Sequence, residues 1–246
     1  MPERPAPADV PAPVVDTVLR GHALFSDQGS AGLCGVYLVE QGPRRILFDC
    51  GHTGRRKALH RALARRGLST DDVDTLVLSH THWDHMQNAD LFPHAEILVH
   101  PEELARLGEE SAHDPAAPPW SAAVLRGLAV RPVTDGREIA PGVTVVGLPG
   151  HTPGSIGLAV DTGAGTALLS GDAVSSAKAL RARCCTVVTT GQAAAARTME
   201  RVRSTAAFVY PGHDRPFTVV DGAPGRYLLP RADMASAPPD PLTAEP

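Results

Sequence analysis

The sequence is poor in aromatic residues and has no excess of positive charge. Phe, Trp and Tyr make up 4% of its 246 residues, which leaves little for an extended platform on which unpaired bases could stack. The formal net charge is -4 at pH 7, whereas domains that bind nucleic acid usually carry a basic surface. Both shortages disfavour nucleic acid as a partner.

Long apolar runs and cysteine motifs are also missing. No window of eighteen consecutive apolar residues occurs, so we expect no transmembrane helix and no membrane partner. The cysteines, Cys34, Cys50, Cys184 and Cys185, form no Cys-x-x-Cys pair and no disulfide framework. The proline-rich N-terminus lacks the apolar segment of a signal peptide. Together these features predict a cytoplasmic protein with reduced thiols.

Proline and alanine are concentrated at the two ends of the chain. Residues 1–13 and 231–246 have this composition and are expected to be disordered tails. Residues 14–230 are expected to form one domain, because a segment of this length can bury a single large core.

Within this domain, apolar strand-like runs alternate with segments of helical spacing. Helices are expected at 53–66, 101–107 and 192–203. Runs of strands with interspersed helices favour an α/β fold, in which two mixed β-sheets are sandwiched between helices. The expected strands are 14–25, 33–40, 45–49, 75–79, 95–100, 128–133, 143–149, 155–161, 166–170 and 206–210.

Histidine and aspartate gather in one short run directly after the strand expected at 75–79. The run contains His80, His82, Asp84 and His85. Ionisable and polar side chains are rarely buried together unless they pair or bind a metal. We therefore predict that these side chains are metal ligands delivered at a strand end.

Three further candidate ligands lie beside glycine, each after a later strand. They are His151 in Gly-His-Thr-Pro-Gly, Asp172 in Ser-Gly-Asp-Ala and His213 in Pro-Gly-His-Asp. Glycine permits the tight turns that can direct such side chains inward. Strand ends that converge on one edge would join these residues to the first run.

The complete ordered set resembles the metallo-β-lactamase-fold hydrolase superfamily, over a stretch from about Leu33 to His213. This resemblance implies an αββα sandwich and a dinuclear metal centre. It assigns His80, His82 and His151 to one metal, Asp84, His85 and His213 to the other, and Asp172 to a bridge between them. It also implies that Asp49 accepts a hydrogen bond that orients a ligand.

The ligand types indicate a hydrolytic centre. Imidazole and carboxylate without cysteine suit Zn²⁺, with Fe or Mn as alternatives. Two zinc ions can hold a hydroxide that attacks an acyl or phosphoryl centre. Asp84 and Asp172 are the expected catalytic residues, Asp84 as a carrier of the proton that reaches the leaving atom.

The resemblance narrows the reaction by elimination. A bridging aspartate at 172 disfavours antibiotic hydrolysis, and the short interval between His151 and Asp172 leaves no room for the inserted domain of larger RNA-processing members. About thirty residues follow His213, too few for the helical domain of glyoxalase II-like thioesterases. The small single-domain group remains, which includes the N-acyl-homoserine lactonases.

Two functions stay open within that group. The leading one is hydrolysis of an ester, lactone or thioester of a small molecule, although the tyrosine that lactonases usually carry after the bridging aspartate is absent from 173–176. The alternative is a small phosphodiesterase, because an endoribonuclease-like branch shares Leu-Phe-Pro at 91–93 and Pro-Gly-His-x-x-Pro-Phe at 211–217. A metal-binding module without catalysis is disfavoured, because the whole ligand set is retained.

Other conspicuous residues receive simpler interpretations. Asp214 is interpreted as a turn residue and Trp83 as a packing residue, and His22 is the one remaining histidine that could line the mouth of the pocket. Gln87 replaces the glycine usual after the first motif, so the loop is expected to differ there. The loop at 109–119 could lie over the site, and a homodimer is possible through an edge strand.

Overall fold

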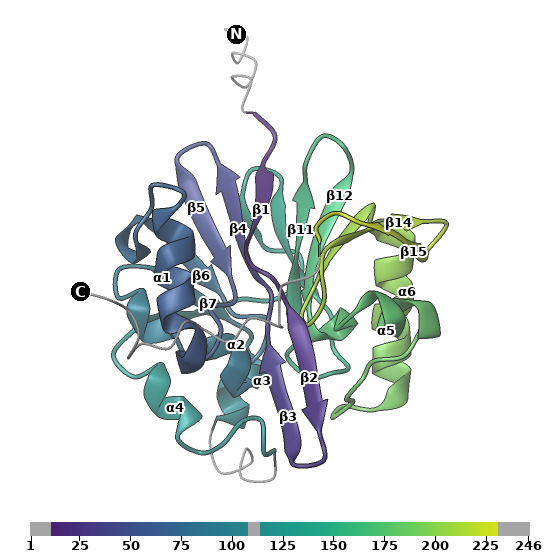
Figure 1. The fold of residues 1–246 in the computed structure, drawn as a ribbon, viewed down its shortest axis with the longest axis horizontal. Coiled ribbons are helices and arrows are strands. Elements are labelled where there is room, and N and C mark those ends of the chain that lie inside the picture. The colour runs from purple at the N-terminus through teal and green to yellow at the C-terminus, as the bar shows by residue number, and fades with distance from the viewer. Residues whose placement is uncertain (1–10, 108–113, 231–246) are drawn as a thin grey trace, which may run out of the picture.

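The computed structural model describes residues 11–107 and 114–230, and most of its strands form two mixed sheets (Figure 1). The first sheet has the order β1 (Val14–Leu19), β4 (Val36–Gln41), β5 (Arg44–Phe48), β6 (Thr75–Val77), β7 (Glu96–Val99) and β8 (Ala129–Pro132). The second has the order β15 (Ala223–Tyr227), β14 (Phe217–Val220), β13 (Phe208–Pro211), β12 (Thr166–Gly171), β11 (Ile156–Asp161), β10 (Val143–Gly147) and β9 (Glu138–Ala140).

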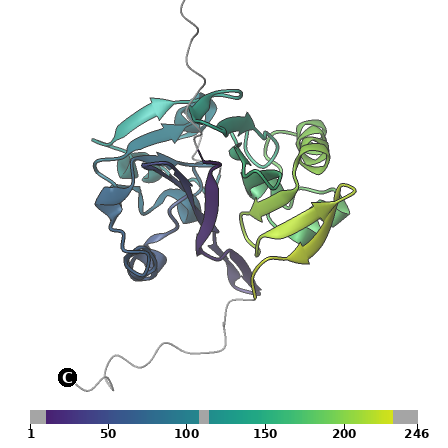
Figure 2. The same cartoon turned by 90° about the horizontal axis from the view of Figure 1, so that it is seen from above.

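Helices cover the outer face of each sheet, as the view from above makes clear (Figure 2). The first sheet carries α1 (Arg56–Ala64), α2 (Trp83–Met86), α3 (Pro101–Arg106) and α4 (Ser121–Val124), and the second carries α5 (Ala177–Ala182) and α6 (Gln192–Thr205). Short 3₁₀ turns lie at η1 (Thr53–Arg55), η2 (Thr70–Asp72), η3 (Ala89–Leu91) and η5 (Asp172–Val174). The predicted αββα sandwich is confirmed.

The layers follow from the alternation of apolar side chains along the central strands. In β4, Tyr37 and Val39 join the core between the sheets, whereas Val36 and Leu38 join the core under α1. Successive side chains of a strand point to opposite faces, so a strand that is apolar at every position must be covered on both sides. Three separate buried clusters result, one for each interface between layers.

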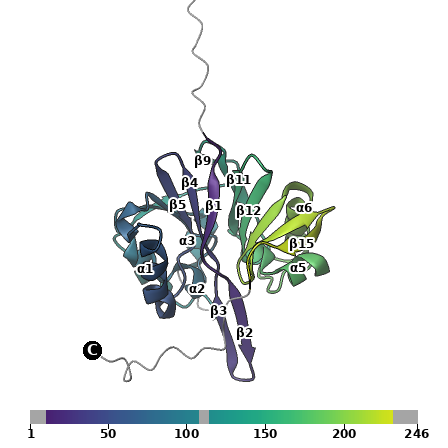
Figure 3. The same ribbon diagram turned by 45° about the horizontal axis from the view of Figure 1, so that its top comes forward.

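The prediction of one continuous strand at 14–25 is wrong. The chain instead forms β1, turns at Gly21, and continues as β2 (His22–Ser26), which pairs with β3 (Gly29–Leu33) in a separate hairpin. A Cβ atom at position 21 would lie 2.6 Å from the carbonyl oxygen of Gly212, so this turn needs glycine. The hairpin projects from one end of the sandwich (Figure 3).

The sequence prediction also omits the last hairpin, β14 and β15, and the short helix α5. The segment of β15 contains proline and glycine, which strands generally disfavour. Because β15 lies at the edge of its sheet, Pro224 is tolerated there. Whether a strand lies at the edge is decided by the assembled sheet, so the local sequence pattern could not predict β15.

Packed residues extend into the segment that was predicted to be the first tail. Pro13 is buried, and the carbonyl oxygen of Pro11 accepts a hydrogen bond from Gln41 Nε2 at 3.1 Å, so packing begins inside the segment assigned to the first tail. The tail at 231–246 lies outside the described residues. Among the residues described, no helix combines the length and the apolar character needed to cross a membrane.

Candidate metal centre

The sequence-predicted ligands converge at one end of the sandwich, beyond the ends of strands. His80 follows β6, His151 lies in the turn between β10 and β11, and His213 follows β13. Strand ends on the two sheets thus meet at a single edge, where the rigid core holds the turns in place. The remaining members are His82, Asp84 and His85, which lie at or in α2, and Asp172, which begins η5 directly after β12.

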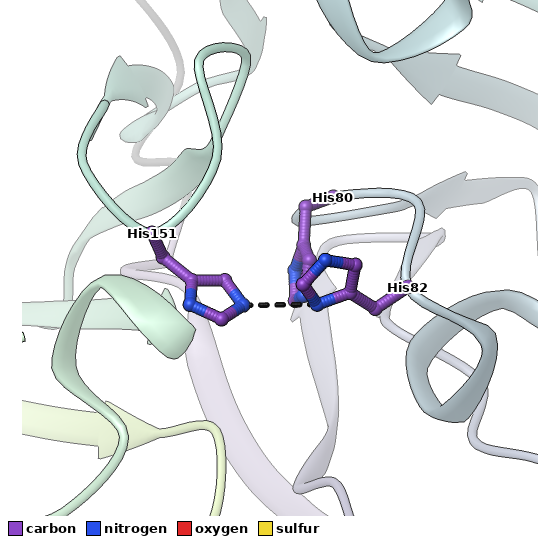
Figure 4. A group of neighbouring side chains, drawn as sticks. All are labelled: His80, His82 and His151. Carbon is purple, nitrogen blue, oxygen red and sulfur yellow. Dashed lines mark hydrogen bonds between the residues drawn. The ribbon is translucent and has the colours of Figure 1, made fainter. Parts of the chain in front are cut away.

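His80, His82 and His151 face one another across two loops (Figure 4). Their nearest ring nitrogens all lie within 4.8 Å of each other, and His151 Nε2 lies 3.0 Å from His82 Nδ1. All three side chains are buried. We call them the first trio; three converging imidazoles match the protein ligands of a tetrahedral zinc site with one open position.

Asp84, His85 and His213 form a second trio beside the first. Their ligand atoms also lie within 4.8 Å of each other. His213 Nε2 is 3.4 Å from Asp84 Oδ2 and 3.4 Å from His85 Nε2. Two imidazoles and one carboxylate could hold a second divalent cation.

Asp172 lies between the two trios. Its Oδ2 atom is 3.5 Å from His151 Nε2 and 3.1 Å from His213 Nε2. A Cβ atom at position 212 would overlap Asp172 Oδ1, so the glycine before His213 creates the space for this carboxylate. The position suits a bridge between two cations.

Unpartnered atoms test whether metal ions fit this arrangement. His80 Nε2 and Asp172 Oδ1 are buried and have no hydrogen-bond partner among the described residues. A buried polar atom without a partner costs about 1–3 kcal/mol, and a cation between these ligands would remove that cost. The residues present therefore fit a pair of metal ions.

The electrostatics of the trios differ. Burial, with help from neighbouring imidazoles, holds the pKa of His80 well below its usual range, and burial lowers the pKa of His151 to about 4. Burial also acts to lower the pKa of His85, but the carboxylates of Asp84, Asp49 and Asp172 outweigh it and raise that pKa to about 10. His80 and His151 are thus neutral and ready to ligate, whereas the carboxylates around His85 favour a positive charge there.

Asp49 contacts the second trio in the way that the family resemblance implies. Its Oδ2 atom lies 2.7 Å from His85 Nδ1, and its Oδ1 atom accepts a hydrogen bond of 2.8 Å from the backbone N–H of Ser79. Asp49 has a φ of 57°, a left-handed conformation that is uncommon outside glycine. Such backbone strain persists where surrounding contacts enforce it; here those contacts direct His85 Nε2 toward the cluster.

The sequence analysis did not identify the groups that orient the first trio. Asp114 Oδ2 lies 3.1 Å from His82 Nε2 and also receives a hydrogen bond from Arg106. The contact with His82 lowers the pKa of Asp114 to about 2. His151 Nδ1 lies 3.1 Å from the carbonyl oxygen of Val187. Contacts to the second ring nitrogen fix the tautomer that ligates, but no spacing rule links these partners in the sequence.

Several other interpretations can be compared with the structure. Asp214 accepts a hydrogen bond from the backbone N–H of Ala177 at 3.1 Å, as a structural turn residue would. Trp83 makes an edge contact with His52. Gln87 has a φ of -61° and accepts a hydrogen bond from the backbone N–H of Thr53 at 3.2 Å. Glycine is therefore not needed at position 87, and the side chain ties α2 to η1.

A cluster of histidine and aspartate at one end of an αββα sandwich is typical of metal-dependent hydrolases with the metallo-β-lactamase fold. The model of the metallo-beta-lactamase superfamily matches residues 29–213. The chain belongs to this superfamily, and the prediction of a superfamily hydrolase is confirmed.

Named relatives extend this comparison. Metallo-beta-lactamase domain-containing protein 1 of Mus musculus is 32% identical over 209 residues, which cover 82% of this chain and 70% of the relative. The Xenopus laevis protein of the same name is 37% identical over 153 residues, or 62% of this chain, and the match spans only 57% of that relative. N-acyl homoserine lactonase AiiB of Agrobacterium fabrum is 32% identical over 107 residues, which cover 40% of this chain and 39% of the lactonase.

Solved structures share the fold at lower identity. A putative metallo-beta-lactamase from Thermotoga maritima superposes with a TM-score of 0.69 at 21% identity and covers 84% of this chain and 99% of its own. A point mutant of AiiA from B. thuringiensis, with N-decanoyl-L-homoserine bound at its active site, superposes with a TM-score of 0.66 at 19% identity and covers 83% and 94%. At these identities the likeness supports the architecture alone.

Proposed function

We propose that this protein is a dinuclear zinc hydrolase that cleaves a carboxylic ester, lactone or thioester of a small molecule. The main observation in support is the pair of trios with Asp172 between them. Its Oδ2 atom lies 3.5 Å from His151 Nε2 and 3.1 Å from His213 Nε2. The local similarity to a lactonase supports an acyl substrate. We further propose that all the ligands named above, from His80 to His213, bind these ions.

Two bound zinc ions would supply an activated water at neutral pH and would polarise the oxygen of the scissile bond. The protein contributes proton transfer through Asp84. Asp84 Oδ2 faces His85 and His213, at 3.8 and 3.4 Å from their Nε2 atoms, so we assign the proton to Oδ1. Oδ1 would accept the proton that the attacking water loses and return it to the oxygen or sulfur that leaves.

The backbone of β3 helps to orient Asp84. A Cβ atom at position 32 would overlap Asp84 Oδ2 and would lie 2.8 Å from His213 Cε1. Glycine at position 32 therefore lets the hairpin approach the second trio. This contact limits the positions that the Asp84 carboxylate can take.

Residues 173–176 do not replace the tyrosine that is absent from this segment. Ser175 Oγ lies 2.6 Å from Thr186 Oγ1, and Ser176 Oγ accepts a hydrogen bond from the backbone N–H of Ala179. Both hydroxyls thus have structural partners. We therefore propose the broad ester, lactone and thioester class rather than homoserine lactones alone.

Phosphodiester cleavage is the alternative suggested by the motifs shared with an endoribonuclease-like branch. Phe92 belongs to the core under α1 and Phe217 to the core under α6, and both are buried. These two phenylalanines pack the fold and do not line the cluster, and His213 of the second motif belongs to the ligand set that either reaction would use. The motifs therefore give phosphodiesters less support than the sequence alone suggested.

The test compares turnover of an acyl-homoserine lactone, an S-acyl thioester and bis(p-nitrophenyl) phosphate by the zinc-loaded protein. We expect at least one acyl substrate to be cleaved much faster than the phosphodiester. Protein stripped with a chelator and then reloaded with zinc provides the control, and it should lose and regain this activity. Faster cleavage of the phosphodiester would contradict the proposal and favour the alternative.

A further inference from the structure

Glu103 is a fully buried carboxylate that none of the proposed steps uses. It lies in α3, and its side chain accepts three hydrogen bonds. Glu103 Oε2 accepts from the backbone N–H and the hydroxyl of Thr81, each at 2.9 Å. Glu103 Oε1 accepts from the backbone N–H of Gly154 at 3.0 Å. A buried carboxylate is tolerated only when its oxygens are satisfied in this way.

The three donors belong to the two loops that carry the first trio. Thr81 lies between His80 and His82 in the sequence, and Gly154 follows His151 by three residues. These loops face each other across the trio (Figure 4). The Glu103 carboxylate therefore connects the two loops. Its hydrogen bonds are charge-assisted and stronger than neutral ones.

The packing at Gly154 shows how closely the second loop approaches α3. A Cβ atom there would lie 2.8 Å from Glu103 Cγ, 2.8 Å from the Glu103 backbone nitrogen and 2.9 Å from His100 Nδ1. Any larger residue would push the loop away from the helix. The loop that carries His151 is thus held at one distance from α3.

We propose that Glu103 is a positioning residue that sets the spacing between the His80/His82 loop and the His151 loop, and thereby the metal affinity of the first trio. It acts through Thr81 and Gly154 and touches neither metal nor substrate. The second trio does not depend on it, because Asp49 and Ser79 orient His85 instead. This inference rests on the proposed metal centre.

Glutamine is the informative substitution. Glu103→Gln keeps the size of the side chain but replaces one acceptor oxygen with an NH₂ group. In either orientation the NH₂ group faces a backbone N–H, that of Thr81 or that of Gly154. One loop must therefore lose its backbone hydrogen bond while the packing volume stays the same.

The experiment measures zinc affinity by competition with a chromogenic chelator, and the visible spectrum of the Co²⁺-loaded protein. In Glu103→Gln we expect about 10- to 100-fold weaker binding of one of the two ions and a changed Co²⁺ spectrum. The other ion should bind as in the unchanged protein. Glu102→Gln is the matched control, because Glu102 is the exposed neighbour in α3, and it should match the unchanged protein in both readouts.

Thr81→Val provides a second route if Glu103→Gln does not fold. It removes the hydroxyl donor and keeps the backbone N–H, so we expect a smaller loss of affinity at the same ion. If the original protein binds two zinc ions and a folded variant binds them with the same affinities, the role of Glu103 is overturned while the metal centre stands. Failure of the unchanged protein to bind zinc would overturn the metal centre and this inference together.

Discussion

The two trios of the candidate centre are supported by different parts of the molecule. Asp49 orients His85 from the end of β5, next to the strand that precedes His80. His82 and His151 instead depend on Asp114, beyond α3, and on the carbonyl of Val187, beyond α5. The sheet edge thus holds the second trio and, through Ser79 Oγ at 2.9 Å from its Nδ1 atom, His80. Segments outside the sheets hold the other two members of the first trio.

The two trios also differ in the charge that surrounds their imidazoles. The second trio contains one carboxylate, Asp84, and lies beside two more, Asp49 and Asp172; together they raise the pKa of His85 to about 10. The first trio is made of imidazoles alone, and burial lowers the pKa of His151 to about 4. We infer that the second trio attracts a cation by charge, while the first relies on geometry. Substitutions of supporting residues should therefore affect the two ions separately.

The largest effect is expected where the trios meet. Asp172→Ala removes the carboxylate that approaches both His151 and His213, so both ions lose a ligand. We expect zinc content to fall from about two ions per chain to fewer than one, with loss of hydrolysis, because ligand count sets affinity. Elemental analysis after dialysis measures the content. Retention of two ions would contradict the bridging role.

A large effect on rate is expected at Asp84, measured with zinc in excess so that the second trio stays occupied. Asp84→Asn keeps an oxygen that can face the second trio but cannot carry the proton, so kcat should fall by about 10²- to 10⁴-fold. Asp90→Asn is the control, because Asp90 is an exposed residue that pairs with Arg56. Full turnover by Asp84→Asn with both ions bound would refute the proton transfer.

The sequence predicted which side chains gather at one edge of the sandwich because their positions obey local rules. Each ligand follows an apolar strand, and the core between the sheets brings those strand ends together. The αββα architecture was also predictable, since strands such as β4 are apolar on both faces. The remaining histidines were harder to interpret: His52 and His100 accept backbone hydrogen bonds at the starts of η1 and α3.

The supporting residues were not predictable in the same way. Glu103 resembles Glu102 beside it in the sequence, yet one is buried against two loops and the other is exposed. Only tertiary packing distinguishes them. The same holds for Asp114, whose contact with His82 spans 32 positions, and for Gly21, where a side chain would clash with the backbone of Gly212.

A moderate effect is expected at Asp49, larger at the second trio than at the first, which Asp49 reaches only through Ser79 Oγ and His80. Asp49→Asn weakens the hydrogen bond to His85 Nδ1 and removes the negative charge, so one zinc ion should bind about 10- to 100-fold more weakly. If the trios are separately supported, this variant and Glu103→Gln weaken different ions. Metal titrations of both variants and of the double variant test this point. Equal losses at the same ion would show that the trios share one support.

The smallest effect is expected at Asp114, because its carboxylate is partly exposed and shares its charge with Arg106. Asp114→Asn retains an acceptor for His82 Nε2 but loses the charge, so the affinity of the first trio should fall by roughly tenfold, at the lower end of the range for such contacts. Asp135→Asn is the control. Asp135 also pairs with an arginine, Arg201, but its side chain is more exposed than that of Asp114. A loss as large as that in Glu103→Gln would mean that orientation of the His82 ring matters as much as the spacing of the loops. No loss would leave Glu103 and the carbonyl of Val187 as the supports of the first trio.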